Sequence, residues 1–420
     1  MEPYRFRPFG GRLVTPQSLP AASLPAGPRR TSRARIVALA AIVAAWVPPA
    51  ATAQTPTDSP EGFEDGALYH AAARAAVEAG HRYLRSKRQP KNWYGENRDF
   101  QVAVTALTGL SFLAGGHVPG RGEYGKEVEA AVAYFLELAE RGSSKGYLAE
   151  AEEKSKMHGH GYATLFLAEV YGMTRDEATR VRIGLAIEGA VKCIVDAQES
   201  RPGELGEMGG WGYEPNDSDR SHEGSITVCC LQALRAARDV GFKVPKHTLV
   251  KAIRYLIASQ NPDGSFLYRI GGGRSHSTLP LTAAAIATMN AFGVYDDTTT
   301  RILGEDLPQL PDCMRKGLAF IDRRVFIGDE EDRYYQNFWF YAEYYASQVY
   351  YKSRFPGAGR QWNKYYARTR DKLLDPQDDE SHYDAKAGYW RSDKYGNAYA
   401  TATATLILQI PLRYLPIFQR

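Results

Sequence analysis

Two kinds of helix alternate along the chain, as judged from where hydrophobic and polar residues fall. One kind is amphipathic with a charged face, as in residues 247–260, HTLVKAIRYLIASQ. The other kind is small or apolar on almost every side, as in residues 281–292, LTAAAIATMNAF, and residues 399–410, YATATATLILQI. A helix that is apolar all round is buried on most faces, whereas an amphipathic helix covers a core and meets water. The pattern therefore predicts pairs of one outer and one inner helix.

The pair recurs about six times along the chain. An aromatic residue follows each predicted outer helix, at intervals of 54 to 64 residues: Trp93, Tyr147, Trp211, Phe266, Phe326 and Trp390. The predicted inner helices lie roughly over residues 100–113, 161–171, 225–240, 279–292, 335–350 and 399–409. An open row of six pairs would leave two apolar ends uncovered. We therefore expect a closed all-α ring, a single α/α6 toroid of six inner and six outer helices, with an open α-solenoid as the alternative.

The N-terminal segment follows a different pattern. Four arginines between positions 29 and 35 precede an apolar run over residues 36–47, and residues 51–53, Ala-Thr-Ala, supply a small-x-small cleavage site. This order predicts a signal peptide over residues 1–53 and export to the periplasm or the outside of the cell. The apolar run is shorter than the ~20 residues that a spanning helix needs, so we expect no stable membrane span after cleavage. An uncleaved N-terminal anchor is the alternative.

The signal segment also changes the charge balance. Residues 1–53 hold seven arginines and one glutamate, a net charge of +6. Since the formal net charge of the whole chain is +4, the rest of the chain is near −2. Without a basic surface, nucleic acid is not expected as a partner. Residues 54–66 are polar and read as a linker, and residues 67–420 as the toroid. The chain has only four cysteines, and their spacing forms no metal or disulfide framework. No cofactor is expected.

A short motif ties this repeat to a known family. A glutamine at the end of an outer helix is followed by Gly-x-Trp or Gly-x-Phe, or by a close variant: Gln198 with residues 209–211, Gln260 with residues 264–266, and Gln377 with residues 388–390. This motif resembles the prenyltransferase/squalene-oxidase repeat of squalene–hopene cyclases and of protein prenyltransferase β subunits. The resemblance covers nearly all of residues 67–420 and implies an α/α toroid. It also implies that the glutamine and the aromatic ring tie neighbouring units together.

The catalytic motifs of these families are not found. The stretch nearest to the Asp-x-Asp-Asp acid of the cyclases is residues 217–220, Asp-Ser-Asp-Arg, in which an arginine stands in place of the last aspartate. Loss of a carboxylate that tunes its neighbour weakens the case for protonating an alkene. The zinc ligands of the prenyltransferases and the Gly-Cys-Gly-Glu-Gln motif of complement-type thioester domains are also missing. Whether the chain is an enzyme is left open.

Polar side chains gather where the inner helices begin, since those starts face one mouth of the ring. Imidazoles are common metal ligands and general bases, and carboxylates serve as acids and bases, although such positions also suit helix caps. The candidate metal ligands are His158, His160 and His222. The candidate catalytic residues are Asp99, Asp219 and Glu223.

One predicted inner helix is unusually aromatic. Helical spacing over residues 334–345 puts aromatic rings on two neighbouring faces. Such rings can line a site for isoprenoid chains, sugars or cations, although core filling is the alternative. The candidate ligand-binding residues are Tyr334, Tyr335, Phe338, Trp339 and His276.

Three functions are compatible with these patterns. The first is an exported toroid that binds an apolar small molecule or a peptide in an aromatic-lined central cavity, without an assigned catalytic activity. The second is an isoprenoid-processing enzyme that uses a non-standard acid. The third is a glycan-active enzyme, which would need two carboxylates facing each other across a groove, ~5–9.5 Å apart.

Overall fold

Two concentric layers of helices make up the fold. The computed structural model describes residues 68–141, 146–198, 209–215, 222–270, 277–295, 297–326, 338–353, 359–378 and 381–419. All of them belong to one unit, residues 62–420. The inner helices are α3 (Gln101–Ala114), α5 (Lys156–Tyr171), α7 (Gly224–Asp239), α9 (Leu279–Ala291), α12 (Trp339–Lys352) and α14 (Asn397–Gln409). The outer helices are α2 (Ala71–Ser86), α4 (Gly125–Glu140), α6 (Glu177–Ala197), α8 (Lys246–Ala258), α10 (Leu310–Phe326) and α13 (Gly359–Leu374).

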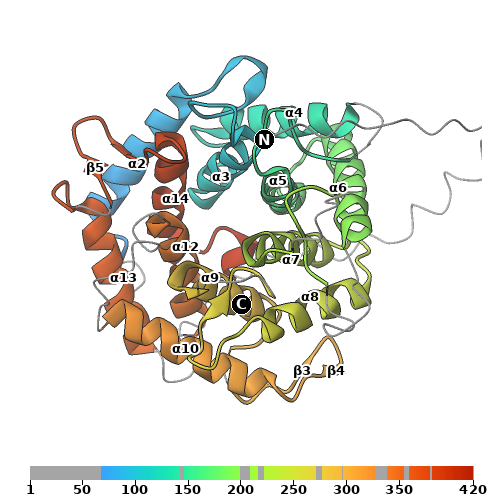
Figure 1. The fold of residues 1–420 in the computed structure, drawn as a ribbon. Coiled ribbons are helices and arrows are strands. Elements are labelled where there is room, and N and C mark those ends of the chain that lie inside the picture. The colour runs from blue at the N-terminus through green and yellow to red at the C-terminus, as the bar shows by residue number, and fades with distance from the viewer. Residues whose placement is uncertain are drawn as a thin grey trace, which may run out of the picture. The chain divides into compact units, whose positions relative to one another are not determined.

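The inner helices close into a ring. Each packs on the next, in the order α3, α5, α7, α9, α12 and α14, and α14 packs back on α3 (Figure 1). Helix α9 is buried at every position from Leu279 to Ala291, whereas α2 buries only one stripe of its surface. This difference follows from their sequences, because the side chains of α9 are small or apolar on all sides. The predicted toroid is confirmed, and the open solenoid is excluded.

Two inner helices begin at other residues than the sequence predicts. Helix α5 begins at Lys156 rather than near residue 161, so His158 and His160 lie within its first two turns. Helix α12 begins at Trp339 rather than near residue 335. Residues 331–337, which include part of the predicted aromatic helix, lie outside the described residues.

The repeated glutamine joins neighbouring units, as the resemblance implies. The Gln198 amide donates to the carbonyl oxygens of Gly209 (3.2 Å) and of Thr248 in α8 (2.8 Å). The Gln260 amide likewise donates to Gly264 (3.2 Å) and to Cys313 in α10 (2.9 Å). Each glutamine thus ties its own loop to the next outer helix. Gln377 differs from both, since it is exposed and lies three residues beyond the end of α13.

A second contact recurs in the loop that enters each inner helix. The backbone N–H of the loop aromatic donates to a threonine hydroxyl one turn or so into the following helix. The pairs are Tyr94 with Thr105 (2.9 Å), Trp211 with Thr227 (3.2 Å), Phe266 with Thr282 (3.1 Å) and Trp390 with Thr401 (3.1 Å). In the first unit the aromatic at this position is therefore Tyr94 and not Trp93. Phe326, the predicted aromatic of the fifth unit, is the last residue of α10.

Short pairs of antiparallel strands lie in the loops between helices. They are β1 (Phe266–Leu267) with β2 (Ser277–Thr278), β3 (Arg301–Ile302) with β4 (Glu305–Asp306), and β5 (Tyr383–Asp384) with β6 (Tyr389–Trp390). The turn before β1 needs Gly264, whose φ is +95° and whose hypothetical Cβ would lie 2.2 Å from the Lys316 carbonyl oxygen. A residue with a side chain would be strained there on both counts. A 3₁₀-helix, η2 (Pro90–Asn92), lies in the loop after α2.

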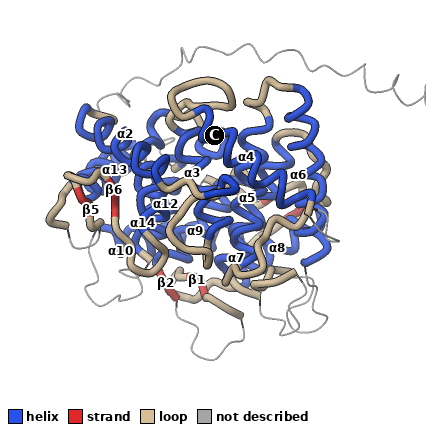
Figure 2. The backbone as a smooth tube through the Cα atoms, turned by 90° about the horizontal axis from the view of Figure 1, so that it is seen from above, coloured by secondary structure: helices blue, strands red, loops and turns tan. Residues whose placement is uncertain are grey.

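The C-terminal segment packs across the end of the ring at which the inner helices finish. Two 3₁₀-helices, η3 (Ile410–Leu412) and η4 (Pro416–Phe418), follow α14. The Ile417 N–H donates to a carboxylate oxygen of Glu169 near the end of α5 (3.4 Å), and the rings of Phe418 and Tyr344 meet edge to face. Figure 2 shows β1 and β2 at one end of the ring and the C-terminus toward the other. The two ends of the ring therefore differ in character.

Further sequence-based expectations concern the cysteines, membrane-spanning helices and the N-terminal segment. Cys193, Cys229, Cys230 and Cys313 are free thiols, and all but Cys193 are buried. Among the described residues, none of the helices combines the length and apolarity needed to cross a bilayer. The predicted signal peptide and linker lie outside the described residues, so cleavage and export stay predictions.

Candidate functional site

Half-buried aromatic rings collect at the end of the ring where the inner helices begin. Phe100 and Phe338 precede α3 and α12, Tyr395 and Tyr399 flank the start of α14, and Tyr213 and Tyr268 lie in the loops before α7 and α9. We call these six residues the aromatic mouth. The same end carries the β1–β2 pair (Figure 2).

Four rings of the aromatic mouth are linked through Tyr395, and the other two are paired through their hydroxyls. Tyr395 meets Phe100 edge to face at 5.2 Å and lies 6.2 Å from Phe338, and its other neighbour is Tyr399 at 5.1 Å. The hydroxyls of Tyr213 and Tyr268 are hydrogen bonded to each other. The Lys394 ammonium lies 4.0 Å from the centre of the Phe338 ring, a favourable cation–π distance. The mouth thus combines ring faces, phenol hydroxyls and positive charge.

Beside the mouth, Glu223 begins α7. Its carboxylate is fully buried and accepts hydrogen bonds from the backbone N–H groups of Ser225 (3.3 Å) and Ile226 (3.2 Å), which caps the helix. The Ser225 hydroxyl lies 2.7 Å from both carboxylate oxygens. Burial raises the pKa of Glu223 to about 7, although the hydrogen bonds from Ser225 and Ile226 and the charge of Arg269 act to lower it.

The hydrogen bonding continues from α7 to α5. The Ser225 hydroxyl is 2.9 Å from Nε2 of His158, and Nδ1 of His158 is 2.6 Å from the Ser155 hydroxyl. Burial lowers the pKa of His158 to about 4, so its imidazole is neutral at neutral pH. We call Ser155, His158, Ser225 and Glu223 the serine–histidine chain. The His158 ring is 6.3 Å from that of Tyr213, which places this chain at the aromatic mouth.

The structure separates the three histidines proposed as metal ligands. Nδ1 of His160 accepts the Leu148 N–H (3.1 Å), which is the contact that a threonine makes in four other units. His222 accepts the Gly210 N–H (3.4 Å), while His158 belongs to the serine–histidine chain. Within the described residues, no three side chains of His, Cys, Asp or Glu converge as a metal site would require. His160 is therefore a structural residue of the second unit.

Of the three candidate catalytic carboxylates, the structure shows two. Asp99 is ion paired with Lys154 and partly exposed, Glu223 is described above, and Asp219 lies outside the described residues. A third carboxylate, Glu153, was not predicted. It is buried, accepts the Val102 N–H at the start of α3 (3.0 Å), and burial raises its pKa to about 8. The sequence offers no signal for it, because it lies in a charged run, residues 150–154, that is typical of exposed surface.

The aromatic candidates divide into mouth and core. Phe338 belongs to the aromatic mouth, whereas Trp339 is 2% exposed and packs edge to face on Phe340. Tyr344 and Tyr345, farther along α12, are also only 2% and 0% exposed. Tyr334, Tyr335 and His276 lie outside the described residues. A ligand role for these residues stays a prediction, but Trp339 is placed as a core side chain.

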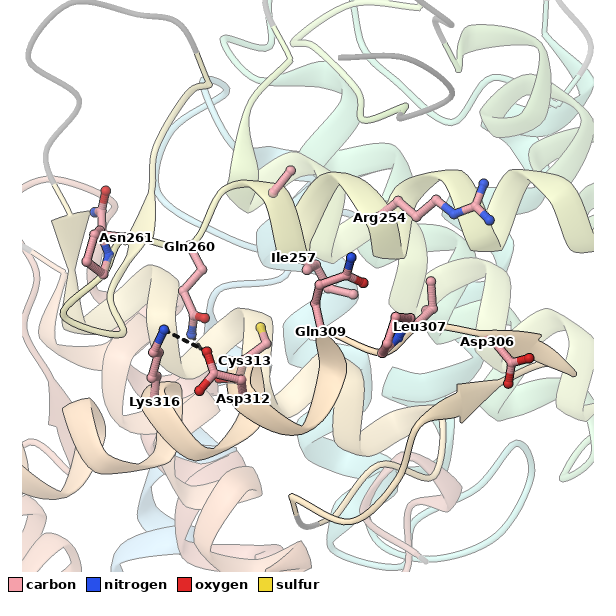
Figure 3. A pocket seen from close by; sticks show the side chains of 13 residues that line it. Arg254, Ile257, Gln260, Asn261, Asp306, Leu307, Gln309, Asp312, Cys313 and Lys316 are labelled. Carbon is pink, nitrogen blue, oxygen red and sulfur yellow. Dashed lines mark hydrogen bonds and ion pairs between the residues drawn. The ribbon is translucent and has the colours of Figure 1, made fainter. Parts of the chain in front are cut away.

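A separate cavity of about 700 Å³ lies on the outer wall, between α8 and α10. Figure 3 shows Gln260, Cys313, Asp312 and Lys316 on its wall, with an ion pair of 2.6 Å between the last two. The Gln260 amide is the one that joins α8 to α10. Gln260 thus joins neighbouring units at this cavity, whereas the Asp312–Lys316 pair lies within α10.

Comparison of the chain with known proteins identifies a shared fold but no family. No family model matches the chain, and no curated protein matches it. Among solved structures, an inactive variant of the GH76A α-1,6-mannanase of Salegentibacter sp. HEL1_6 in complex with α-1,6-mannotetrose is 10% identical, with a TM-score of 0.57, and the match covers 80% of this chain and 98% of that one. The GH76 α-mannanase of Bacteroides thetaiotaomicron is 10% identical, with a TM-score of 0.52 over 82% and 97% of the two chains. These similarities establish the α/α toroid as the fold of this chain.

Proposed function

We propose that the protein binds a carbohydrate chain at the aromatic mouth. The observation that carries this proposal is the set of six half-buried rings, four of which bear hydroxyls, at one end of the toroid. Aromatic faces with a polar edge suit ligands that are flat and apolar on one side and hydrogen bonding on the other. A pyranose ring has this character. The similar fold of mannanases, one of them in complex with an α-1,6-mannan oligosaccharide, and the predicted export support the same ligand class.

An apolar or isoprenoid ligand is less well supported. Such a ligand would need exposed apolar surface inside the ring, but the interior rings of Trp339, Tyr344 and Tyr345 are 0–2% exposed. Side chains this deeply covered pack against protein and not against a space that a ligand could fill. The hydroxyl-bearing mouth therefore favours a polar ligand over the apolar small molecule expected from the sequence.

Binding is proposed without cleavage of the glycosidic bond. Glycoside hydrolysis uses two carboxylates, one of them an acid and the other a base or nucleophile. At the described part of the mouth, Glu223 is fully buried and engaged as a helix cap, and Asp99 is paired with Lys154. Both of these candidate carboxylates are thus engaged by protein partners, and neither is assigned as the acid or the base.

Calorimetric titration of the full chain tests the proposal. The probes are α-1,6-mannotetraose, a β-1,4-linked glucan oligomer and geranylgeraniol. We expect at least one saccharide to bind, and Tyr395→Ala to weaken it about tenfold, since a stacked ring contributes about 1 kcal/mol or more. Tyr414→Ala is the matched control, because Tyr414 is an exposed tyrosine on the C-terminal segment. Binding of geranylgeraniol alone, or equal effects of the two substitutions, would contradict the proposal.

A further inference from the structure

We infer that Ser155 is the nucleophile of an ester-hydrolysing site, that His158 is its general base, and that Ser225 and Glu223 are positioning residues. The inference goes beyond carbohydrate binding, since it assigns a covalent chemistry to the serine–histidine chain. Only the choice of ester, an acyl group on a bound carbohydrate, rests on the proposed function.

When Glu223 is ionised, the order of donors and acceptors along the chain has one consistent solution. An ionised carboxylate only accepts hydrogen bonds, so the Ser225 hydroxyl donates to Glu223, 2.7 Å away. The Ser225 oxygen then accepts a hydrogen bond from the Nε2–H of His158 at 2.9 Å. A neutral imidazole with its proton on Nε2 has a free lone pair on Nδ1, and that atom accepts a hydrogen bond from the Ser155 hydroxyl at 2.6 Å. The geometry therefore orients the base toward Ser155.

The local structure of Ser155 also departs from the usual role of a serine at this position. Ser155 is the N-cap residue of α5, but its hydroxyl makes no capping bond to the helix backbone. Serine is favoured at this position because its oxygen accepts a first-turn N–H. Here the hydroxyl is directed to the His158 side chain instead, and Ser155 is half-buried, not enclosed. A serine hydroxyl that is hydrogen bonded to a histidine, and not to the helix backbone, has the contact with a base that a nucleophile needs.

The start of α5 also offers stabilisation for an oxyanion. The first-turn N–H groups of a helix have no acceptor within the helix and carry the positive end of its dipole. The Met157 N–H donates to the Tyr213 carbonyl (3.0 Å), which ties this turn to the mouth. The N–H groups of Lys156 and His158 belong to the same turn and lie beside the Ser155 hydroxyl in sequence. These two N–H groups are the donors that we assign to the oxyanion of an acyl group on Ser155.

The proposed reaction balances without a cofactor. The Ser155 oxygen attacks the ester carbonyl carbon while its proton passes to Nδ1 of His158. The imidazolium then donates this proton to the leaving alkoxide oxygen, which departs as the alcohol and leaves an acyl ester on Ser155. A water molecule, deprotonated by His158, attacks that ester, and the proton returns to the Ser155 oxygen as the carboxylic acid leaves. The net reaction consumes one ester and one water.

Covalent labelling of the full chain with a fluorophosphonate probe tests the nucleophile directly. We expect one modified peptide, and we expect tandem mass spectrometry to place the probe on Ser155. Labelling should disappear in Ser155→Ala and persist in Ser86→Ala, since Ser86 is an exposed serine whose hydroxyl donates to a local carbonyl, that of Tyr83. An unlabelled wild-type chain, or a probe on another serine, would overturn the inference without any variant having to fold.

Kinetics separate the nucleophile from the positioning residues. With p-nitrophenyl acetate and an acetylated manno-oligosaccharide, Ser155→Ala should lower kcat by about 10³-fold or more. Ser225→Ala should lower kcat about tenfold with KM unchanged, because it removes one orienting hydrogen bond and no substrate contact. A rise in KM with constant kcat would show that Ser225 only shapes the site and would remove it from the proposed chain. Ser155→Ala should still bind saccharide, so hydrolysis and binding can fail independently.

Discussion

At the scale of single residues, two opposing effects act on the pKa of buried glutamates at inner-helix starts. Glu153 and Glu223 accept backbone N–H groups at the starts of α3 and α7. Helix N-termini favour a negative charge, but burial in a medium of low dielectric constant disfavours it. Burial prevails at both positions, because the pKa is raised to about 8 for Glu153 and to about 7 for Glu223.

Glu153→Gln should make stability less dependent on pH. A raised pKa means that the folded chain holds its proton more tightly than the unfolded chain, so stability falls as pH rises between the ordinary value of 4.5 and about 8. The neutral amide can still accept the Val102 N–H and has no charge to bury. We expect similar stability near pH 4.5 and a variant more stable than wild type at pH 9, by a few kcal/mol at most. Urea unfolding at pH 5, 7 and 9 measures the difference.

Glu152→Gln provides the control for this comparison. Glu152 is the neighbouring residue, but its side chain is 66% exposed and paired with the exposed Arg98. An exposed pair of this kind contributes little, about 0–1 kcal/mol, so the control should follow the wild-type pH dependence. A Glu153→Gln curve parallel to wild type would show that Glu153 is ionised in the folded chain at neutral pH.

The candidate site could be predicted in part at this scale. His158 and Glu223 were identified because they lie near the starts of inner helices, which the hydrophobic pattern locates. Ser155 was not, because α5 begins about five residues earlier than the pattern suggests and the Ser155–His158 bond depends on that start. The role of His160 also required the structure, since nothing in the chain shows that it replaces a threonine of the other units.

At the scale of the helix pair, the bond from a loop N–H to an inner-helix threonine fixes each loop on its helix. Thr282 accepts the Phe266 N–H (3.1 Å) and also donates to the Thr278 carbonyl (2.8 Å). Both residues are buried, so the N–H could not turn to water if the hydroxyl were lost. A buried donor without an acceptor costs about 1–3 kcal/mol. The threonine therefore determines the position of the loop that carries the aromatic ring.

Thr282→Val should destabilise the protein more than Thr288→Val. Both threonines are fully buried on α9, and valine keeps the shape of each side chain. Thr288 donates to the carbonyl of Ala284 (2.8 Å), a helix carbonyl that keeps its backbone partner. We expect a difference in unfolding free energy of about 1–3 kcal/mol between the two variants, measured by chemical denaturation. Equal losses would show that the Phe266 N–H finds another acceptor.

Helix pairing was predictable from the sequence, whereas the joints within each pair were not. Inner and outer helices differ strongly in polarity, so their order and number follow from the pattern, as α9 and α2 illustrate. Threonines are common on the inner helices, and Thr108 and Thr288 resemble Thr105 and Thr282 in sequence. Only the folded loop shows which of them accepts an aromatic N–H.

At the scale of the whole toroid, the last unit interlocks with the first. The Ser111 hydroxyl of α3 lies 2.7 Å from the Thr405 hydroxyl of α14 and 3.0 Å from the His81 ring of α2. Gln409 of α14 donates to the Ser111 carbonyl (3.1 Å). These buried bonds join the two ends of the described helical chain. The hydrophobic pattern predicted closure because open ends would be apolar, but it could not identify the residues that meet.

We call the contact of α14 with α2 and α3 the seam of the ring. A glycine of α2 lies in it and offers a test of closure. A Cβ on Gly80 of α2 would lie 2.7 Å from Cγ2 of Thr405 and 3.2 Å from the Trp390 ring. On α6, a Cβ on Gly184 would meet its nearest atom, in Tyr171, only at 3.5 Å. Alanine gains about 1 kcal/mol over glycine in a helix, but overpacking costs about 1–3 kcal/mol. We expect Gly184→Ala to stabilise the protein and Gly80→Ala to destabilise it.

Hydrogen exchange then distinguishes a closed ring from a row of separately stable pairs. In the closed ring, α14 packs on both α2 and α3, so loosening the seam with Gly80→Ala should speed amide exchange in α2 and α14 together. These helices lie at opposite ends of the sequence, and in an open row only the pair that carries the substitution would loosen. Faster exchange confined to α2, with α14 as protected as α7, would show that the contacts between α14 and α2 contribute little to stability. Joint loosening, with α7 unchanged, would identify the seam as the point at which the toroid opens first.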